Sequence, residues 1–155
     1  MTLDARRDVH RVIANPGPAS VDLSPAPGGI GPNLLQRDFT VNALALPLQL
    51  WPNVAPSQVI DPCGGLEDLH IGCLRVVSQA SLSKDPLRML RAVRLSGELG
   101  FDIDDQTSAS IGSHASLISS VAGERIRDEL VRLMRPPGVG RRLRKLDELG
   151  LLTRL

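Results

Sequence analysis

The sequence contains 155 residues, 42% of them hydrophobic, and its 18 basic and 17 acidic side chains leave a formal net charge of +1. This balance excludes a polybasic tail or an acidic disordered segment as the main feature of the chain. Every apolar run is shorter than the ~20 residues that a membrane span needs, and residues 1–20 lack the apolar core of a secretory signal. Two cysteines are too few for a disulfide framework. We therefore expect a cytoplasmic protein that does not engage a membrane.

Nine of the twelve prolines precede residue 63, and this bias divides the chain into two unlike parts, residues 1–83 and residues 84–155. The first part reads as short strands broken by turns. In it we predict strands at 9–13, 21–23, 59–60 and 74–77, a loop at 24–32, a turn-rich stretch at 61–72, and either a helix or a buried strand at 40–46.

The second part is predicted to be helical, which makes the whole chain an α+β protein with about four helices after residue 83. The first helix has Asp85 as its N-cap, Pro86 in its first position and Gly100 at its left-handed exit. The second begins at Asp104 or Asp105 and runs towards residue 118. The third and fourth cover residues 124–134 and 139–149.

Within the third helix, an apolar face recurs at helical spacing, and an ion pair is expected on the opposite face. The pair consists of Asp128 and Arg132, four residues apart. The apolar face comprises Ile126, Leu130, Leu133 and Met134.

The basic side chains are sixteen Arg and two Lys, and three arginines repeat on the first predicted helix. Arg88, Arg91 and Arg94 are spaced i, i+3, i+6, so they occupy an arc of roughly 120° over roughly 9 Å of helix axis. One guanidinium group can bind phosphate oxygens through two parallel hydrogen bonds. The length of the row, roughly 9 Å, matches a triphosphate or a few backbone phosphates. The alternative is a solvated basic face on an amphipathic helix.

Two further clusters are weaker signals. Arg37 and Asp38 precede an apolar run that contains Asn42, an arrangement typical either of charges aimed into a cleft or of a helix cap. Residues 63, 70 and 73 read C-x6-H-x2-C, which lacks a fourth ligand and matches no common zinc pattern. We expect Cys63 and Cys73 to be small buried residues, and we assign no metal ligand.

Four segments together resemble the class II tRNA nucleotidyltransferase and bacterial poly(A) polymerase family. They occur in the family's order and cover most of residues 33–150. The resemblance implies that residues 1–83 are the last part of a nucleotidyltransferase head domain, and that residues 84–155 are a helical neck domain cut short at its end. The segments are RDFTVNALAL at 37–46, IDPCGGLEDLHIGCLRVV at 60–77, DPLRMLRAVRLSGELGFDID at 85–104 and GERIRDEL at 123–130.

The resemblance also implies roles for particular residues and partners. Arg37 contacts the phosphates or ribose of the incoming nucleotide. Asp85 and Arg88 read the base edge of CTP or ATP, and Arg91 and Arg94 support that pair and the triphosphate. The whole protein would transfer AMP or CMP to the 3′ end of a tRNA or another RNA, and it would use two Mg²⁺ ions. CCA addition, A addition and poly(A) synthesis remain open.

This chain departs from the family at the metal site. The family's glycine-rich GGxxRD segment is absent, and residues 1–83 contain no DxD; Asp102-x-Asp104 has this spacing but lies in the neck part, in the wrong place for the metal site. Asp22 is the one acidic residue that we weigh as a head carboxylate. Without two carboxylates to hold Mg²⁺, phosphoryl transfer lacks its metal clamp. We therefore expect a truncated member that is inactive by itself and has no catalytic residue of its own. The alternatives are a non-catalytic nucleotide- or RNA-binding module and a gene fragment that does not fold independently.

Overall fold

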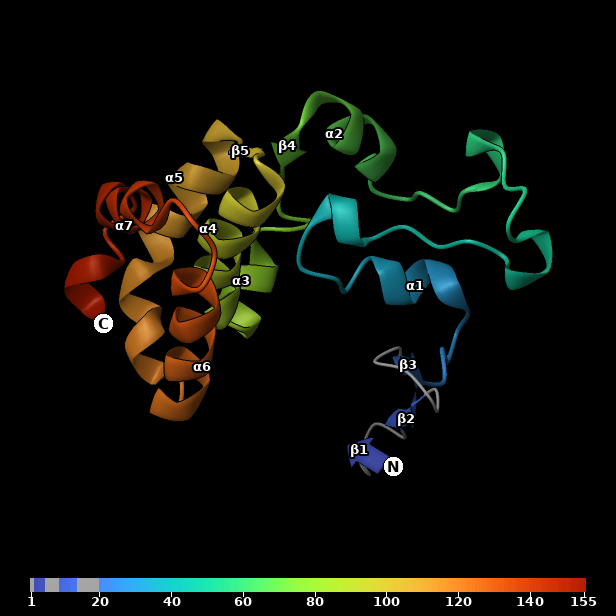
Figure 1. Cartoon of the computed structure of the whole chain (residues 1–155), viewed down its shortest axis with the longest axis horizontal. Helices are drawn as coiled ribbons and strands as arrows, with labels where there is room; N and C mark the ends of the chain where they lie inside the picture. Colours follow the sequence, from blue (N-terminus) through green and yellow to red (C-terminus); the bar gives the residue numbers. More distant parts are fainter. Residues whose placement is uncertain (1, 5–8, 14–19) are drawn as a thin grey trace. The chain divides into compact units, whose positions relative to one another are not determined.

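The computed structural model describes residues 2–4, 9–13 and 20–155, and it has the expected α+β class. The chain forms two compact units, Met1–Asn33 and Leu34–Leu155. Strands dominate the first unit, whereas helices dominate the second (Figure 1). In the part of the chain that the structure describes, no helix combines the length and the apolar character that crossing a bilayer requires.

The first unit contains an antiparallel sheet in the order β1-β2-β3, formed by Thr2–Asp4, Val9–Ile13 and Ser20–Leu23. The strands predicted at 9–13 and 21–23 are therefore confirmed. The register pairs Arg11 with Asp22, and their side chains form an ion pair with Nε and Oδ1 2.7 Å apart. Only part of 24–32 is a loop, because helix α1 (Ile30–Leu34) begins within it. Pro32 is tolerated there, since the first turn of a helix leaves its N–H groups without intrahelical partners.

The second unit is built around helix α4, which packs against α3, α6 and α7 (Figure 1). Its strands β4 and β5 pair in parallel, and they are only two residues long each. The elements of this unit are α2 (Gly65–Ile71), β4 (Cys73–Leu74), α3 (Ala80–Lys84), α4 (Leu87–Leu99), β5 (Asp102–Ile103), α5 (Asp105–His114), α6 (Gly123–Met134) and α7 (Val139–Glu148).

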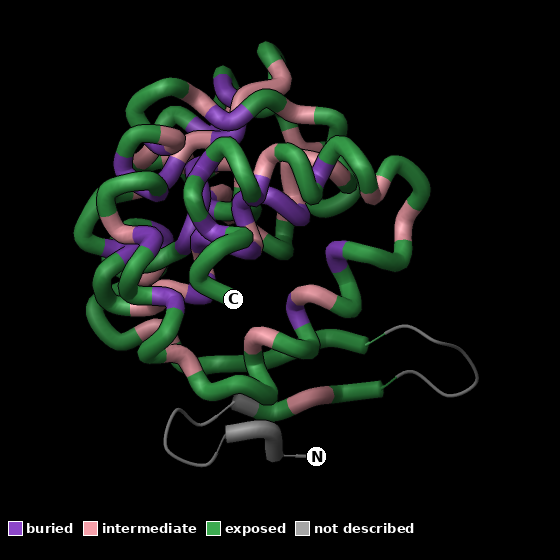
Figure 2. The backbone as a smooth tube through the Cα atoms, turned by 90° about the vertical axis from the view of Figure 1, so that its left-hand side faces the viewer, coloured by how far each residue is buried: buried purple, intermediate pink, exposed green. Residues whose placement is uncertain are grey.

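The hydrophobic core lies in this second unit, where the buried parts of the backbone gather (Figure 2). Helix α4 supplies Met89, Leu90 and Val93, whose i, i+1, i+4 spacing places them on one side of the helix. Leu133 of α6 and Leu146 of α7 are also fully buried. Burial of each such side chain contributes about 1.5–3 kcal/mol relative to exposure.

Most helix boundaries after residue 83 agree with the predictions, except at the start of α4 and at the end of α5, where a 3-10 helix (Ala115–Ser120) follows His114. Asp104 caps α5 by accepting a hydrogen bond from the backbone N–H of Thr107 at 3.1 Å, and Gly100 ends α4 with a φ of 71°. The N-cap of α4, however, is Pro86, and Asp85 lies one residue earlier, where it ends α3. The prediction of Asp85 as the N-cap is therefore wrong. Its carboxylate instead bonds to a side chain of another helix.

Helix α6 spans the predicted residues, but two of its side chains differ from the prediction. Met134, the last residue of α6, is 48% exposed, whereas its neighbour Leu133 is fully buried. Asp128 pairs with its neighbour Arg127 at 3.1 Å, in place of the expected pairing with Arg132.

The largest disagreement concerns residues 40–77. Residues 40–46 form a short 3-10 turn and one strand bridge, and 61–72 contain α2, which we had predicted as turns. Asp61 starts α2, since its two carboxylate oxygens accept N–H groups from Gly65 at 2.8 Å and Leu66 at 3.0 Å. At Gly65 a Cβ would lie 2.1 Å from the carbonyl oxygen of Thr40. The glycine therefore allows α2 to approach this turn. Cys63 and Cys73 are partly exposed, whereas we had expected both to be buried.

Candidate nucleotide-binding site

The arginines of α4 reach back to the segment that begins with RDFT. Arg88 donates from Nη1 to the carbonyl oxygen of Arg37 at 3.2 Å and from Nη2 to that of Gln36 at 3.0 Å. Both acceptors are main-chain groups, so Arg88 fixes the course of this segment and lies beside Arg37. The side chain of Arg37 is exposed.

Arg91 makes the second connection, an ion pair with the buried carboxylate of Asp38. Arg91 donates from Nε at 2.8 Å and lies within 2.6 Å through Nη2. The other carboxylate oxygen accepts N–H groups from Phe39 at 3.0 Å and from Asn42 at 3.2 Å. Burial opposes the charge on Asp38, but Arg91 and these two donors outweigh it and hold the pKa of Asp38 below its ordinary value. Asp38 and Asn42 thus have structural partners, and neither serves as a helix cap.

Asp85 faces a residue to which we had assigned no role. Nη2 of Arg125, on α6, lies 3.1 and 3.0 Å from the two carboxylate oxygens of Asp85. Both side chains are partly exposed, so the pair is open to a ligand. Arg125 lies in GERIRDEL, one of the four family segments, and this membership could have marked it as a candidate site residue. Its pairing with a residue forty positions earlier was not predictable from spacing.

Arg94 differs from the other arginines of the row because it is buried, with 9% of its surface exposed. It binds the carboxylate of Glu129 on α6 and that of Glu98 one turn later on α4, the latter at 2.6 Å. Burial alone would lower the pKa of Arg94, but these carboxylates raise it above the ordinary arginine value. The alternative of a solvated basic face therefore does not hold for Arg94, and its predicted support of the triphosphate stays a prediction. Its charge is satisfied inside the helical unit.

A second ion-pair network, which the sequence analysis did not predict, contacts the RDFT segment at Thr40. Asp68 of α2 accepts the hydroxyl of Thr40 at 2.7 Å and pairs with Arg75 at 3.1 Å. Arg75 also pairs with Asp104, the cap of α5, at 3.0 Å. This network ties α2, β4 and α5 to the turn that follows Asp38.

The resulting cluster combines three exposed or half-exposed guanidinium groups with one carboxylate, on Arg37, Arg88, Arg125 and Asp85. Guanidinium forks bind phosphate oxygens or the acceptor atoms of a base, and a carboxylate accepts from an exocyclic amine. The cluster is therefore chemically suited to a nucleotide. It is held in place by Arg91 and by the Asp68 network.

The acidic residues that the structure describes do not fit a pair of Mg²⁺ ions. Asp22 is paired with Arg11 in the sheet. The carboxylate of Asp38 already accepts hydrogen bonds from Arg91, from Asn42 and from the backbone N–H of Phe39. Within the described ranges there is no group of three His, Cys, Asp or Glu side chains placed to hold a metal ion. Mg²⁺ prefers oxygen ligands in near-octahedral geometry, which these isolated carboxylates do not supply.

Comparison with known proteins finds two family models in this chain. Residues 17–75 match the family model described as the poly(A) polymerase head domain. Residues 100–155 match the one described as the probable RNA and SrmB-binding site of polymerase A. The chain belongs to the tRNA nucleotidyltransferase and poly(A) polymerase family.

Individual relatives of this tRNA nucleotidyltransferase and poly(A) polymerase family align with nearly the whole chain. The chain is 42% identical to the CC-adding tRNA nucleotidyltransferase of Geobacter sulfurreducens over 136 residues, which are 87% of this chain and 30% of that protein. It is 38% identical to the A-adding tRNA nucleotidyltransferase of Deinococcus radiodurans over 155 residues, covering 97% of this chain and 34% of the relative.

The fold agrees as well. The structure is similar to the Thermotoga maritima CCA-adding enzyme complexed with tRNA, with a TM-score of 0.85 and 26% identity, over 97% of this chain and 36% of that one. The chain thus spans about a third of the length of the relatives that it matches.

Proposed function

We propose that this chain is the nucleotide-binding part of an RNA nucleotidyltransferase that adds CMP or AMP to the 3′ ends of tRNA. The observation that carries the proposal is the convergence of three of the four family segments on one cluster. Arg88 and Arg91 of α4 contact the RDFT segment, and Arg125 of α6 contacts Asp85. Residues far apart in the sequence are brought together where each can contact the same ligand.

In this proposal the polar groups divide the work according to their exposure. Arg37 binds the phosphates or ribose, because it is exposed at the start of its segment. Asp85 and Arg88 read the base edge, and Arg125 orients the carboxylate of Asp85. Arg91 acts on the nucleotide through Asp38 and the segment that Asp38 holds. We assign Arg94 a role in positioning α4 against α6, since Glu129 and Glu98 already occupy it.

The proposed transfer is a property of the whole protein. Metal ions in such reactions neutralise the charge that develops on the transferring phosphoryl group, and the carboxylates in the described part of this chain do not fit that task. The same observation favours a second candidate function for the chain itself, a nucleotide- or RNA-binding module without catalysis. The two candidates share the binding site and differ in whether nucleotide is incorporated.

Binding is tested by titration calorimetry of CTP and ATP against the protein and against Arg88→Ala and Asp85→Asn variants. We expect either substitution to weaken binding by about 1.5–3 kcal/mol, the usual range for hydrogen bonds to charged groups. Arg127→Ala is the matched control, because Arg127 is an exposed arginine on α6 outside the cluster. It should change binding by less than about 0.5 kcal/mol. Unchanged affinity in both cluster variants would refute the site.

Incorporation is tested separately with Mg²⁺, labelled CTP and ATP, and a tRNA that ends before its CCA. We expect residues 1–155 to bind the nucleotides without extending the RNA. Extension by this chain, abolished by Asp22→Ala or Asp38→Ala, would show that these two carboxylates hold the metal ions after all. It would also eliminate the non-catalytic module.

A further inference from the structure

An apolar hairpin follows the RDFT segment, and the proposed nucleotide cluster does not use it. The hairpin comprises residues 43–60, and its two arms lie side by side at Ala45 and Ile60 (Figure 1). The backbone N–H and carbonyl groups of these two residues exchange hydrogen bonds of 3.1 and 2.9 Å. Beyond this closure the chain turns through a 3-10 helix at Leu48–Leu50. We call this turn together with Trp51 the hairpin tip.

Two large apolar side chains lie exposed on the hairpin tip. Leu48 is 82% exposed and Trp51 is 66% exposed, the two highest values among the large apolar side chains that the structure describes. Positions three residues apart in a 3-10 turn lie on the same side of it. The N–H of Trp51 donates to the carbonyl oxygen of Leu48 at 3.1 Å, which fixes this spacing. The two side chains therefore form one exposed apolar surface, and such surfaces mark interaction sites.

The hairpin is held by its own hydrogen bonds before it meets a partner. The N–H of Leu50 donates to the carbonyl oxygen of Pro47 at 3.0 Å. In the returning arm, the side-chain oxygen of Gln58 accepts the N–H of Ala55 at 2.9 Å. A loop that is already ordered loses less conformational entropy when it associates. The tip can therefore bind without first being ordered.

The absence of charge restricts the kind of partner that this hairpin fits. Residues 43–60 contain no Asp, Glu, Lys, Arg or His. Nucleic acids and anionic membranes are bound through basic groups, and the hairpin supplies none. Its partner is therefore an uncharged, apolar protein surface.

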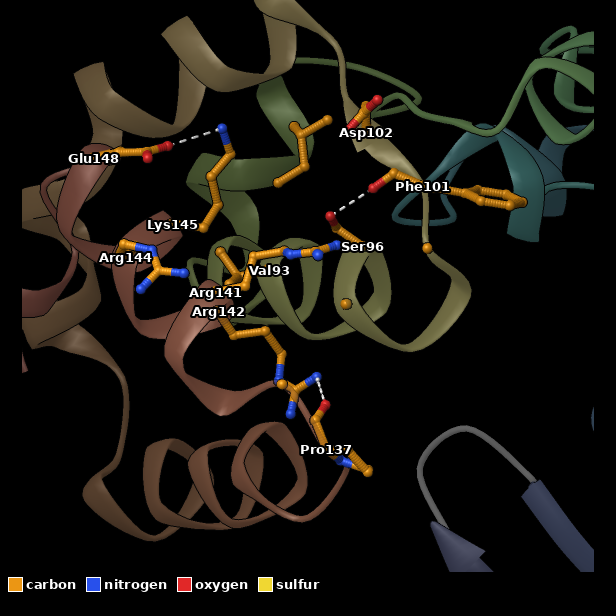
Figure 3. A pocket seen from close by; sticks show the side chains of 14 residues that line it. Val93, Ser96, Phe101, Asp102, Pro137, Arg141, Arg142, Arg144, Lys145 and Glu148 are labelled. Carbon is orange, nitrogen blue, oxygen red and sulfur yellow. Dashed lines mark hydrogen bonds and ion pairs between the residues drawn. The ribbon is translucent and has the colours of Figure 1, made fainter.

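A second copy of the same hairpin meets this requirement. In a two-fold contact the same surface lies on both sides, and residues near the axis face their own copies. A charged surface would bring like charges together there, which is unfavourable. The pocket between α4, β5 and α7 is such a surface, since Arg141, Arg144 and Lys145 line it (Figure 3). The neutral hairpin tip can face its own copy without this repulsion.

We propose that two copies of this chain associate through the hairpin tip, with Leu48 and Trp51 of one copy against the same residues of the other. A covered Trp buries about 150–250 Å², so the tip offers on the order of a few hundred Å² per copy. A standard stable interface buries about 800 Å² per partner. The dimer is therefore weak, with a dissociation constant above about 10 μM. This association goes beyond nucleotide binding and does not depend on it.

The experiment measures self-association of residues 1–155 over a concentration series, by sedimentation velocity and by fluorescence. Trp51 is the single Trp of the chain, so its emission reports directly on the hairpin tip. As the concentration rises, we expect the sedimenting mass to double and the emission to move to shorter wavelength, because Trp51 leaves water. A chain that stays monomeric up to about 1 mM, with unchanged emission, overturns the proposal and leaves a different protein as the partner.

Three exposed side chains distinguish the tip from general hydrophobic association. Leu48→Ser keeps the fluorescent residue and should weaken the dimer by at least about tenfold. Ile71→Ser is the matched control, since Ile71 is 58% exposed at the end of α2. Val21→Thr tests association through the sheet, where Val21 is 59% exposed. Each control should change the dissociation constant by less than about twofold, and a loss in either control equal to that of Leu48→Ser overturns the proposal.

Charges placed at Gln49 test the two-fold arrangement itself. Gln49 is exposed within the turn of the hairpin tip. Gln49→Lys and Gln49→Glu should each weaken the dimer by at least about tenfold, because both copies then bring the same charge to the contact. An equimolar mixture of the two variants should associate at least as tightly as the original chain. A mixture that associates no better than either variant alone overturns the proposal.

Nucleotide binding is measured separately in the same variants. Leu48→Ser should bind CTP within about twofold of the original chain, because Leu48 lies outside the Arg88 cluster. Failure of self-association with intact CTP binding would overturn the dimer alone. Failure of CTP binding in a chain that still dimerises would refute the nucleotide site alone.

Discussion

Neutralising Glu129 tests the assignment of Arg94 as a structural residue. The Glu129→Gln variant keeps the shape of the side chain but leaves Arg94 with a reduced counter-charge in a buried position. Removing one partner of a buried ion pair costs about 3–5 kcal/mol, because the other charge remains uncompensated. Arg94 retains Glu98 at 2.6 Å, on a side chain that is 32% exposed. We therefore expect a smaller loss, about 2–4 kcal/mol.

The assay is equilibrium urea unfolding followed by circular dichroism, together with thermal unfolding. For a protein of this size the expected loss corresponds to a fall in melting temperature of roughly 5–15 °C. The double variant Arg94→Met/Glu129→Leu should recover much of the stability, since replacing both buried charges by apolar groups is often neutral. The affinity of Glu129→Gln for CTP, measured where the variant is folded, should stay within about twofold of the original.

The exposed pair of Arg127 and Asp128 on the same helix provides the comparison. Its side chains are 70% and 64% exposed, so breaking it should cost less than about 1 kcal/mol. If Glu129→Gln costs no more than the Arg127→Ala variant, the buried pair does not stabilise the helical unit as argued. If Glu129→Gln lowers the affinity for CTP while its stability stays unchanged, Arg94 acts on the nucleotide directly.

Three other substitutions test separate parts of the structure. Asp38→Asn should lower stability by about 1–3 kcal/mol at neutral pH. The pKa of Asp38 is lowered in the folded state. Its pairing with Arg91 therefore stabilises the folded state at pH values above the ordinary Asp pKa of about 3.9, and this stabilisation is lost as the pH falls further. In acid, the free energy of unfolding should therefore depend less on pH in the variant than in the original protein. Gly97→Ala should destabilise by about 1–3 kcal/mol in urea unfolding, because the new Cβ overlaps Arg142, and an unchanged midpoint would contradict the close approach. Asp104→Ala removes the cap of α5 and should cost about 0.5–2 kcal/mol, which thermal unfolding measures against the intact protein.

Sequence patterns located the elements whose signals are local. Helices α6 and α7 and the start of α5 were predicted within one or two residues, because their caps and apolar spacing act within a few positions. The end of α5 was placed about four residues too late. Helix α2 was missed, since its start depends on the Asp61 carboxylate and on a glycine that faces the carbonyl of Thr40. The family segments pointed to the nucleotide site, but they did not show which arginines are available to a ligand. The domain boundary between residues 83 and 84 stays a prediction.

The sequence by itself determined that arginines recur at three-residue intervals on one helix. It also determined that the segments around them resemble a family of RNA nucleotidyltransferases. The tertiary structure decided which groups each arginine contacts. Arg91 meets Asp38 across 53 residues of sequence, and Arg94 meets Glu129 across 35. Spacing along one helix fixes the angle between side chains, but it carries no information about the carboxylates that other segments bring to them. The partners therefore emerged only when α4 was packed against α6 and the RDFT segment.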